Sequence, residues 1–250
     1  MRNSVFKCTS DEYGQCILKI GESIKGSETE YQTLREYNGG KFCRVYQADI
    51  PNGVLLMEQI IPGTPLRVEP NLEKRLDLFC ELFDGLHIEP VDDKVYPTYM
   101  DWVSQITEYM RHRSDYKVLY QRMVKAEQIC CDLWTKYPRR MLLHGDLHHD
   151  NILLDSKGRY RIIDPKGVIG DPVFDIPRFI INEFLDKHDD NPDQKFAYIT
   201  RVFSERFNIP KSDIGDLTYV ELCMAHCWQV EDRQEPDISH KLFEILLEGK

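Results

Sequence analysis

The chain has 250 residues, 42% of them hydrophobic, so it can bury one large core or two smaller ones, and this composition excludes a disordered or fibrous protein. Its 42 acidic residues outnumber 32 basic ones, for a formal net charge of -10. That balance removes the electrostatic attraction on which binding to a nucleic-acid backbone depends, so we expect no nucleic-acid partner.

The sequence also argues against a membrane or secreted protein. No apolar run approaches the roughly 20 residues of a membrane helix. The charged start of the chain is not followed by the apolar stretch of a secretory signal. The eight cysteines are scattered and include the neighbours Cys130 and Cys131, a poor disulfide framework. We therefore expect a cytoplasmic protein with reduced, mostly buried thiols and no membrane partner.

The first sixty residues have the pattern of short strands around one helix. β-branched and aromatic positions alternate between turn residues, which predicts strands over 4–9, 15–20, 42–50 and 53–61. A helix over 28–37 is expected to end at the sequence Asn38-Gly-Gly. The prolines and glycine of 61–65 indicate a hinge.

From residue 71 the apolar residues recur every three or four positions, which is the spacing of helices that bury one face. The predicted helices are 72–86, 99–111, 115–137, 174–185, 194–207, 212–232 and 238–247. Short apolar runs at 141–143, 152–154 and 160–163 predict small strands that frame a polar loop. The pattern indicates a strand-rich N-terminal lobe, 1–62, and a larger helical C-terminal lobe, 63–250.

The polar loop carries the chemistry. It reads HGDLHHDN over 144–151, and IDPKG follows at 163–167. Phosphoryl transfer needs a carboxylate that aligns the attacking hydroxyl and accepts its proton, and oxygen ligands that hold magnesium against nucleotide phosphates. Asp146 suits the first role, and Asn151 and Asp164 suit the second. The spacing from Asp146 to Asn151 is that of a kinase catalytic loop.

These motifs resemble the aminoglycoside and choline kinase-like branch of the protein-kinase fold, in which HGDxxxxN is followed by ID. Within this branch, the chain resembles the aminoglycoside/hydroxyurea antibiotic resistance kinases, a streptomycin 6-phosphotransferase-like family in which PKG and then GDPxxD follow the ID. These segments stand here at 165–167 and 170–175. The similarity includes LLMEQIIPGTPL at 55–66 and CWQVED at 227–232, so it spans nearly the whole chain.

The resemblance implies an α+β, bilobal protein-kinase-like fold with a small antiparallel-sheet N-lobe and a larger helical C-lobe. It also implies a small-molecule kinase that uses ATP, or GTP, with Mg²⁺. The phosphoryl acceptor would be a hydroxyl of an aminoglycoside-type, streptomycin-like or related substrate, and the acidic net charge is compatible with a cationic one.

The resemblance further assigns residues to the nucleotide. Lys19 matches the lysine that contacts the phosphates, and Glu30 matches the helix glutamate that pairs with it. Glu28 is the alternative partner, but it lies on another face of the helix, and the family spacing favours Glu30. The backbone around Glu58 and Ile60 would hydrogen-bond the purine.

Acidic residues on the late helices are candidates for binding the ammonium and guanidino groups of the acceptor. Glu231 and Asp232 stand in the CWQVED segment, which resembles a family segment near the acceptor side. Glu183 and Asp186 are further candidates. Asp175 is expected to support the catalytic loop from the helix that follows it.

For two groups of residues, metal binding is an alternative to a structural role. His144, His148 and His149 together suggest zinc as one reading, and the spacing of His144 to His148 suits zinc on a helix. Here they lie on a loop, and in the resemblance His144 braces the catalytic loop. Cys223, His226 and Cys227 share a predicted helix, whose apolar neighbours favour burial of the thiols in the core.

One departure from the family concerns the N-terminus. Family members have a strand and a phosphate-covering loop before the strand expected at 4–9, whereas only three residues precede it here. The first strand is therefore expected to be missing. This departure leaves a second hypothesis, an N-terminally truncated pseudokinase that acts as a nucleotide-binding or scaffold module.

Overall fold

A computed structural model describes residues 3–21, 23–185, 191–237 and 241–248. Contacts divide the chain into two compact units. The first, here called the sheet unit, comprises Met1–Tyr96 and Met141–Ile169, and the second, the helical unit, comprises Pro97–Arg140 and Gly170–Lys250. This division places the predicted catalytic loop with the N-terminal strands. The lobe boundary at residue 62 stays a prediction.

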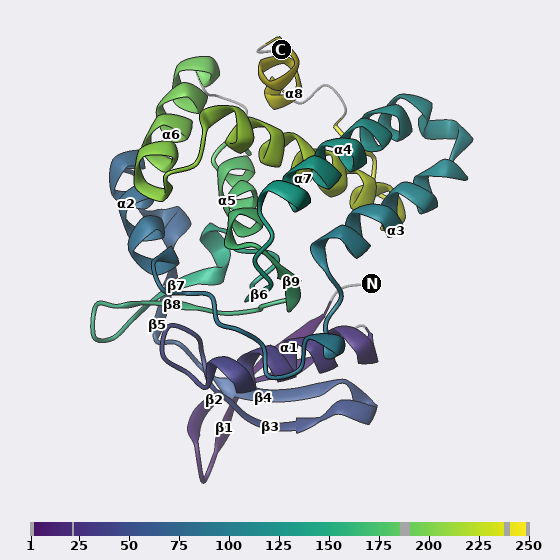
Figure 1. Cartoon of the computed structure of the whole chain (residues 1–250). Coiled ribbons are helices and arrows are strands. Elements are labelled where there is room, and N and C mark those ends of the chain that lie inside the picture. The colour runs from purple at the N-terminus through teal and green to yellow at the C-terminus, as the bar shows by residue number, and fades with distance from the viewer. Residues whose placement is uncertain (1–2, 22, 186–190, 238–240, 249–250) are drawn as a thin grey trace. The chain divides into compact units, whose positions relative to one another are not determined.

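The sheet unit contains a four-stranded antiparallel sheet in the order β1-β2-β4-β3 (Figure 1). Its strands are β1 (Ser4–Ser10), β2 (Gly14–Ile20), β3 (Val45–Asp49) and β4 (Val54–Glu58). β1 and β2 form the hairpin that the sequence predicts, with Ser4 opposite Ile20. β3 starts three residues later than predicted, because Phe42 instead makes an isolated bridge to Ile162 of another sheet.

Helix α1 (Ile24–Tyr37) packs against β3 and β4 of this sheet (Figure 1). It begins four residues before the predicted start, because the Ser23 hydroxyl accepts a hydrogen bond of 2.9 Å from the Gly26 amide and so caps the helix. It ends at Asn38, which adopts a left-handed φ of 44° and donates its N–H to the Leu34 carbonyl.

Two small sheets frame the polar loop, as predicted. β5 (Pro62–Pro65), β7 (Ile152–Asp155) and β8 (Tyr160–Ile162) form one, and β6 (Met141–Leu143) pairs with β9 (Val168–Gly170) in the other. The predicted hinge therefore contains a strand, which follows a cis Ile61–Pro62 peptide bond. Helix α2 (Leu72–Phe83) ends before the predicted residue 86, because its C-cap Asp84 already has an extended backbone and Gly85 follows with a φ of 60°.

The helical unit is built around α7, which packs against each of the other helices of this unit except the short 3-10 turns (Figure 1). Its helices are α3 (Tyr99–Arg111), α4 (Lys117–Lys136), α5 (Ile176–Asn182), α6 (Pro192–Phe207), α7 (Lys211–Glu231) and α8 (Lys241–Glu248). The predicted helix 174–185 is shorter, because a 3-10 turn over Pro172–Asp175 precedes α5. The predicted start of the last helix, 238–240, lies outside the described residues.

The 3-10 turns besides Pro172–Asp175 are Ile50–Asn52, Leu66–Val68, Asp93–Val95, Ser114–Tyr116 and His149–Asn151. Within the ranges that the structure describes, no helix is long and apolar enough to span a membrane. Six of the eight cysteines are buried, in keeping with their expected behaviour as small apolar side chains.

A buried polar cluster joins three helices of the helical unit. The Tyr99 hydroxyl donates to Glu221 Oε2 at 2.5 Å, and Arg178 Nη2 lies 2.6 Å from Glu221 Oε1. The Arg178 guanidinium also lies over the Trp228 ring, 5.5 Å from its centroid. The cluster thus ties α3 and α5 to the central helix α7.

Candidate functional site

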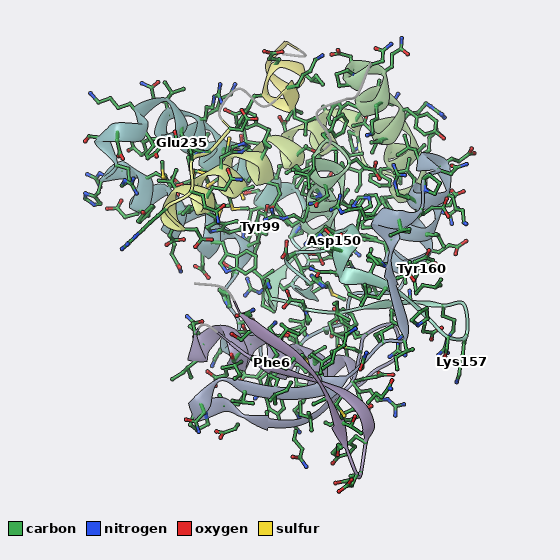
Figure 2. The ribbon with its side chains drawn as sticks, turned by 180° about the vertical axis from the view of Figure 1, so that it is seen from behind. Phe6, Tyr99, Asp150, Lys157, Tyr160 and Glu235 are labelled. Carbon is green, nitrogen blue, oxygen red and sulfur yellow. The ribbon has the colours of Figure 1, made fainter. Side chains whose placement is uncertain are left out.

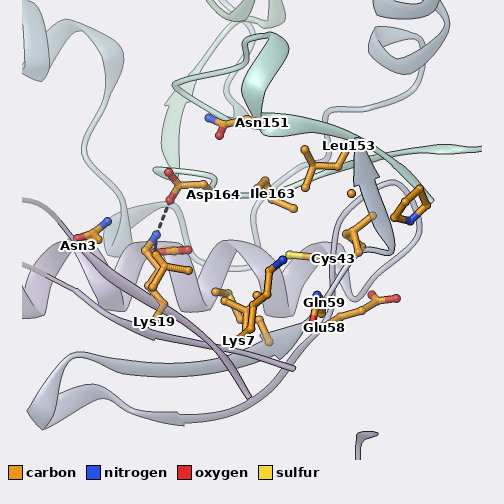
Figure 3. A pocket seen from close by; sticks show the side chains of 17 residues that line it. Asn3, Lys7, Lys19, Cys43, Glu58, Gln59, Asn151, Leu153, Ile163 and Asp164 are labelled. Atoms are coloured by element: carbon orange, nitrogen blue, oxygen red, sulfur yellow. Dashed lines mark hydrogen bonds and ion pairs between the residues drawn. The ribbon is translucent and has the colours of Figure 1, made fainter. Parts of the chain in front are cut away.

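A cavity of about 330 Å³ lies in the sheet unit (Figure 3). Lys19, Asn151 and Asp164 line part of it. Much of the remaining wall is apolar and consists of Val5, Ile17, Met57, Ile60, Leu153 and Ile163. A cavity with a charged part and an apolar part has the properties that a nucleotide needs, because its phosphates require cations and its base requires apolar walls.

Lys19 on β2 and Glu30 on α1 form a buried ion pair at the cavity wall, with Nζ 2.6 Å from Oε2. Burial lowers the pKa of Lys19, but the carboxylates of Glu30 and Asp164 outweigh burial, so that the pKa is raised and the ammonium form persists. Burial raises the pKa of Glu30, against the opposing charge of Lys19. Glu28, the alternative partner, is exposed on α1.

Asp164 lies between two lysines. Its Oδ1 contacts Lys19, as the dashed line in Figure 3 shows, and its Oδ2 lies 2.9 Å from Lys166 Nζ. Burial alone would raise its pKa, but the ammonium groups of Lys166 and Lys19 outweigh burial and hold the pKa below its usual value. The two lysines therefore favour the ionised carboxylate, which is the form that can bind a cation.

His144 braces the loop that carries Asp146. Its Nδ1 accepts a hydrogen bond of 3.1 Å from the Asp146 amide, so Nε2 carries the proton and donates to the Ile163 carbonyl at 2.9 Å. This fully buried ring links the catalytic loop to the residue before Asp164. The contacts are those of a structural residue, in line with the role that the resemblance implies.

Asp146 and Asn151 lie on the same loop. Asn151 Nδ2 donates to the Asp146 carbonyl at 3.0 Å, and the Ile163 amide donates to the Asn151 carbonyl at 2.9 Å. Because the Asn151 amide nitrogen is hydrogen-bonded to the loop, its Oδ1 is the side-chain atom that can serve as a ligand for a metal ion. Figure 3 shows the Asn151 and Asp164 side chains on the same wall of the cavity.

His148 borders the Asp146 carboxylate, with Nε2 3.7 Å from Oδ2. Among the described residues, no three His, Cys, Asp or Glu side chains are gathered as metal ligands, so the zinc alternative at His144 and His148 has no third ligand. His226 instead places Nδ1 2.7 Å from the Leu222 carbonyl of its own helix. Cys223 and Cys227 are buried beside it, as core packing requires.

The end of β4 and the segment after it line the cavity through Glu58, Gln59 and Ile60. The Glu58 amide donates to the Arg44 carbonyl at 2.8 Å, and its Oε2 accepts from the Arg44 amide at 3.0 Å. Arg161 Nη2 lies 3.2 Å from the same oxygen. The Glu58 amide and carboxylate are thus used within the fold, and the purine contact at the backbone of Glu58 and Ile60 stays a prediction.

No sequence pattern assigns a role to five other residues at the site. Asn3, Lys7, Cys43 and Gln59 line the cavity, and Lys166 contacts Asp164. Period-two alternation along β1 could have placed Lys7 on the same face as Val5. Lys166 stands in the PKG motif, but its contact with Asp164 depends on the local backbone, which the motif does not show.

The predicted acceptor residues belong to the helical unit. Glu231 is the last residue of α7 and Asp232 its C-cap, and both are exposed. Desolvation by its neighbours, followed by the charge of Asp232, raises the pKa of Glu231 even though its side chain is largely exposed. Glu183 is buried and lies 3.7 Å from Lys195, which makes it a poor acceptor ligand. Asp186 lies outside the described residues, and Asp175 is buried where α5 begins.

The chain is similar in sequence to three curated kinases. It is 27% identical over 168 residues to a probable serine/threonine-protein kinase KIN1 homolog of Enterocytozoon bieneusi. It is 24% identical over 178 residues to a hydroxyurea phosphotransferase of Kitasatospora aureofaciens and 25% identical over 206 residues to a streptomycin 3''-kinase of Klebsiella pneumoniae. The matches include 62%, 68% and 80% of this chain but 27%, 51% and 71% of the relatives. The chain thus spans about a quarter and about half of the first two.

Solved structures share the fold. Choline kinase LicA of Streptococcus pneumoniae matches with a TM-score of 0.68 at 16% identity, over 98% of this chain and 89% of that one. Amicoumacin kinase hAmiN, in complex with AMP-PNP, Ca²⁺ and Ami, matches with a TM-score of 0.68 at 18% identity, over 99% and 85% of the two chains. The chain therefore has the protein-kinase-like fold that the sequence predicts.

The match to a family covers more of the chain than the match to any of the three curated relatives. Residues 3–233 match the family described as aminoglycoside/hydroxyurea antibiotic resistance kinase. This range contains both the cavity residues and the motifs at 144–151 and 163–167. The chain belongs to the aminoglycoside/hydroxyurea antibiotic resistance kinase family.

Proposed function

We propose that the chain is a small-molecule kinase that transfers the γ-phosphoryl group of ATP, or of GTP, to a hydroxyl group of an aminoglycoside-type or related cationic substrate. The main support is that Lys19, Glu30, Asn151 and Asp164 line one cavity, and much of its remaining wall is apolar. The named activities of the streptomycin and hydroxyurea relatives agree with it. So does the AMP-PNP in the complex of the amicoumacin kinase.

The donor atoms fit a magnesium ion. Asp164 supplies an ionised carboxylate and Asn151 an amide oxygen, the hard oxygen ligands that Mg²⁺ prefers. Magnesium bound to these two residues would neutralise charge on the nucleotide phosphates. Lys19, which Glu30 holds in place, would direct its ammonium group to the same phosphates.

Asp146 is the proposed catalytic base. Its carboxylate would orient the acceptor hydroxyl and take its proton as the phosphoryl group is transferred. His144 fixes the backbone of Asp146 through the hydrogen bond to its amide. The chain would therefore contribute mainly position and charge, and no covalent intermediate with the protein is required. Glu231 and Asp232 are proposed to attract the cationic groups of the acceptor.

The proposal is tested by measuring ADP formation from Mg·ATP by the full chain. The acceptors are streptomycin, other aminoglycosides, hydroxyurea and simple amino alcohols. We expect ADP formation that depends on one class of acceptor. Asp146→Asn should lower kcat by about 100-fold or more while the affinity for nucleotide changes little. Asp150→Asn, on the same loop, is the matched control and should retain most of the activity.

Two results would count against the proposal. Equal kcat for the wild type and Asp146→Asn would remove Asp146 from its role. ATP binding without turnover on any acceptor would favour the alternative, a nucleotide-binding pseudokinase.

A further inference from the structure

Two ammonium groups contact Asp164, but the proposed function uses only one of them. Lys19 is buried and shared between Asp164 and Glu30. Lys166 places Nζ 2.9 Å from the other Asp164 oxygen, and its side chain is 39% exposed. Lys166 can therefore move away from the Asp164 carboxylate without carrying a buried charge into solvent. Lys19 cannot, because its ammonium group is buried.

The backbone of Lys166 is held firmly. Its amide donates to the His144 carbonyl at 2.7 Å, which attaches it to the catalytic loop. The next residue, Gly167, has a φ of 70° and packs so closely on α1 that a Cβ there would lie 2.3 Å from Thr33 Oγ1. Lys166 thus combines a fixed main chain with a flexible, half-exposed ammonium group beside the proposed metal ligand.

Charge counting indicates what this ammonium group does. Lys19, Lys166, Glu30 and Asp164 form a connected cluster of two cations and two carboxylates, with no net formal charge. Without Lys166 the same cluster would carry one negative charge, which would oppose the approach of a polyphosphate. The second lysine therefore favours an anionic ligand at this end of the cavity.

A purely structural role explains these observations less well. An ion pair with a half-exposed lysine contributes at most about 1 kcal/mol to stability. Asp164 is also already held by the buried Lys19.

We propose that Lys166 is a second phosphate-binding cation of this site, in addition to Lys19. Its ammonium group turns from Asp164 Oδ2 to the terminal phosphate of a bound nucleoside triphosphate, and this movement frees the carboxylate oxygen for the divalent cation. The inference rests on the proposed function, because it takes the cavity to be a nucleotide site. It requires Lys166 to distinguish a triphosphate from a diphosphate, since the diphosphate lacks the group that Lys166 contacts.

The test is isothermal titration of the full chain with Mg·AMP-PNP and, separately, with Mg·ADP. Lys166→Ala should weaken Mg·AMP-PNP binding by about tenfold or more, the loss expected for one charge-assisted hydrogen bond, and Mg·ADP binding by much less. Lys166→Arg should restore most of the difference. The control is Lys157→Ala, on the exposed β7–β8 turn labelled in Figure 2, which should change neither affinity.

Each other outcome contradicts the inference. Equal losses for the two nucleotides, or no loss, would show that Lys166 does not contact the terminal phosphate, while the site itself would still bind nucleotide. Failure of the wild type to bind either nucleotide would overturn both this inference and the proposed function. Thermal unfolding of the Lys166 variants shows whether a loss of binding reflects a loss of fold.

Discussion

At the scale of the residue, Asp164 connects the parts of the candidate site. It contacts Lys19 from the four-stranded sheet and Lys166 from its own segment. It adopts a φ of 58°, a left-handed conformation that is uncommon for a residue other than glycine. Such strained backbone persists only where surrounding contacts hold it and is frequent at functional sites.

Asp164→Asn tests the metal role of this side chain. The amide keeps the shape but loses the negative charge, so magnesium should no longer raise the affinity for AMP-PNP as it does in the wild type. We expect a loss of about tenfold or more in the presence of magnesium, the size typical of a charged hydrogen-bonding group. The measurement is titration of AMP-PNP with and without Mg²⁺.

Glu28→Gln is the control for this variant. It removes an exposed carboxylate from α1, two residues from Glu30, and should leave the magnesium effect intact. A full magnesium effect in Asp164→Asn would show that the ion is held elsewhere.

The residues of the site differ in how well they could be predicted. Lys19, Glu30, Asn151 and Asp164 stand in motifs, and the structure brings these four to one cavity. Lys166 could not be assigned, because its contact arises from the left-handed turn at Asp164, and a sequence does not show which of its aspartates adopts such a backbone.

At the scale of the element, the amphipathic helices were the most predictable parts. The predicted and observed bounds of α3 agree at both ends, because Thr98 and Asp101 form a capping box and the apolar spacing is regular. β5 and β9 could not be predicted. They are four and three residues long, and each pairs with a strand that is distant in the sequence.

The buried cluster on α7 makes a prediction at this scale. Glu221→Ala would leave the Arg178 charge and the Tyr99 hydroxyl without their carboxylate partner in the core. We expect the free energy of unfolding to fall by about 3 kcal/mol. All three tryptophans, Trp102, Trp134 and Trp228, lie in the helical unit, so their fluorescence in a urea titration reports on this unit.

The matched control lies on α3. Glu108→Ala removes an exposed carboxylate that pairs with Arg111 and His112 and should change the free energy of unfolding by less than about 0.5 kcal/mol. Equal destabilisation by the two substitutions would show that the buried cluster does not stabilise the unit. Figure 2 labels Tyr99, which contributes to the cluster from the start of α3.

At the scale of the whole molecule, the two compact units are not consecutive halves of the chain. The chain leaves the sheet unit after Tyr96, returns at Met141 and leaves again after Ile169. The segment Met141–Ile169 brings the proposed catalytic loop and Asp164 to the four-stranded sheet, so the proposed nucleotide site lies within one unit. Glu231 and Asp232, the proposed acceptor residues, belong to the other. A pattern of strands followed by helices cannot reveal this return of the chain, because it depends on long-range contacts.

The central claim is that this chain moves a phosphoryl group from a nucleotide to a small-molecule hydroxyl with Asp146 as the base. The most direct measurement follows the label from γ-labelled Mg·ATP after incubation of the full chain with a cationic, hydroxyl-bearing acceptor. The account predicts label on the acceptor with the wild type and almost none with Asp146→Asn, although that variant still binds nucleotide. Label released only as inorganic phosphate, or equal labelling of the acceptor by both proteins, would contradict it.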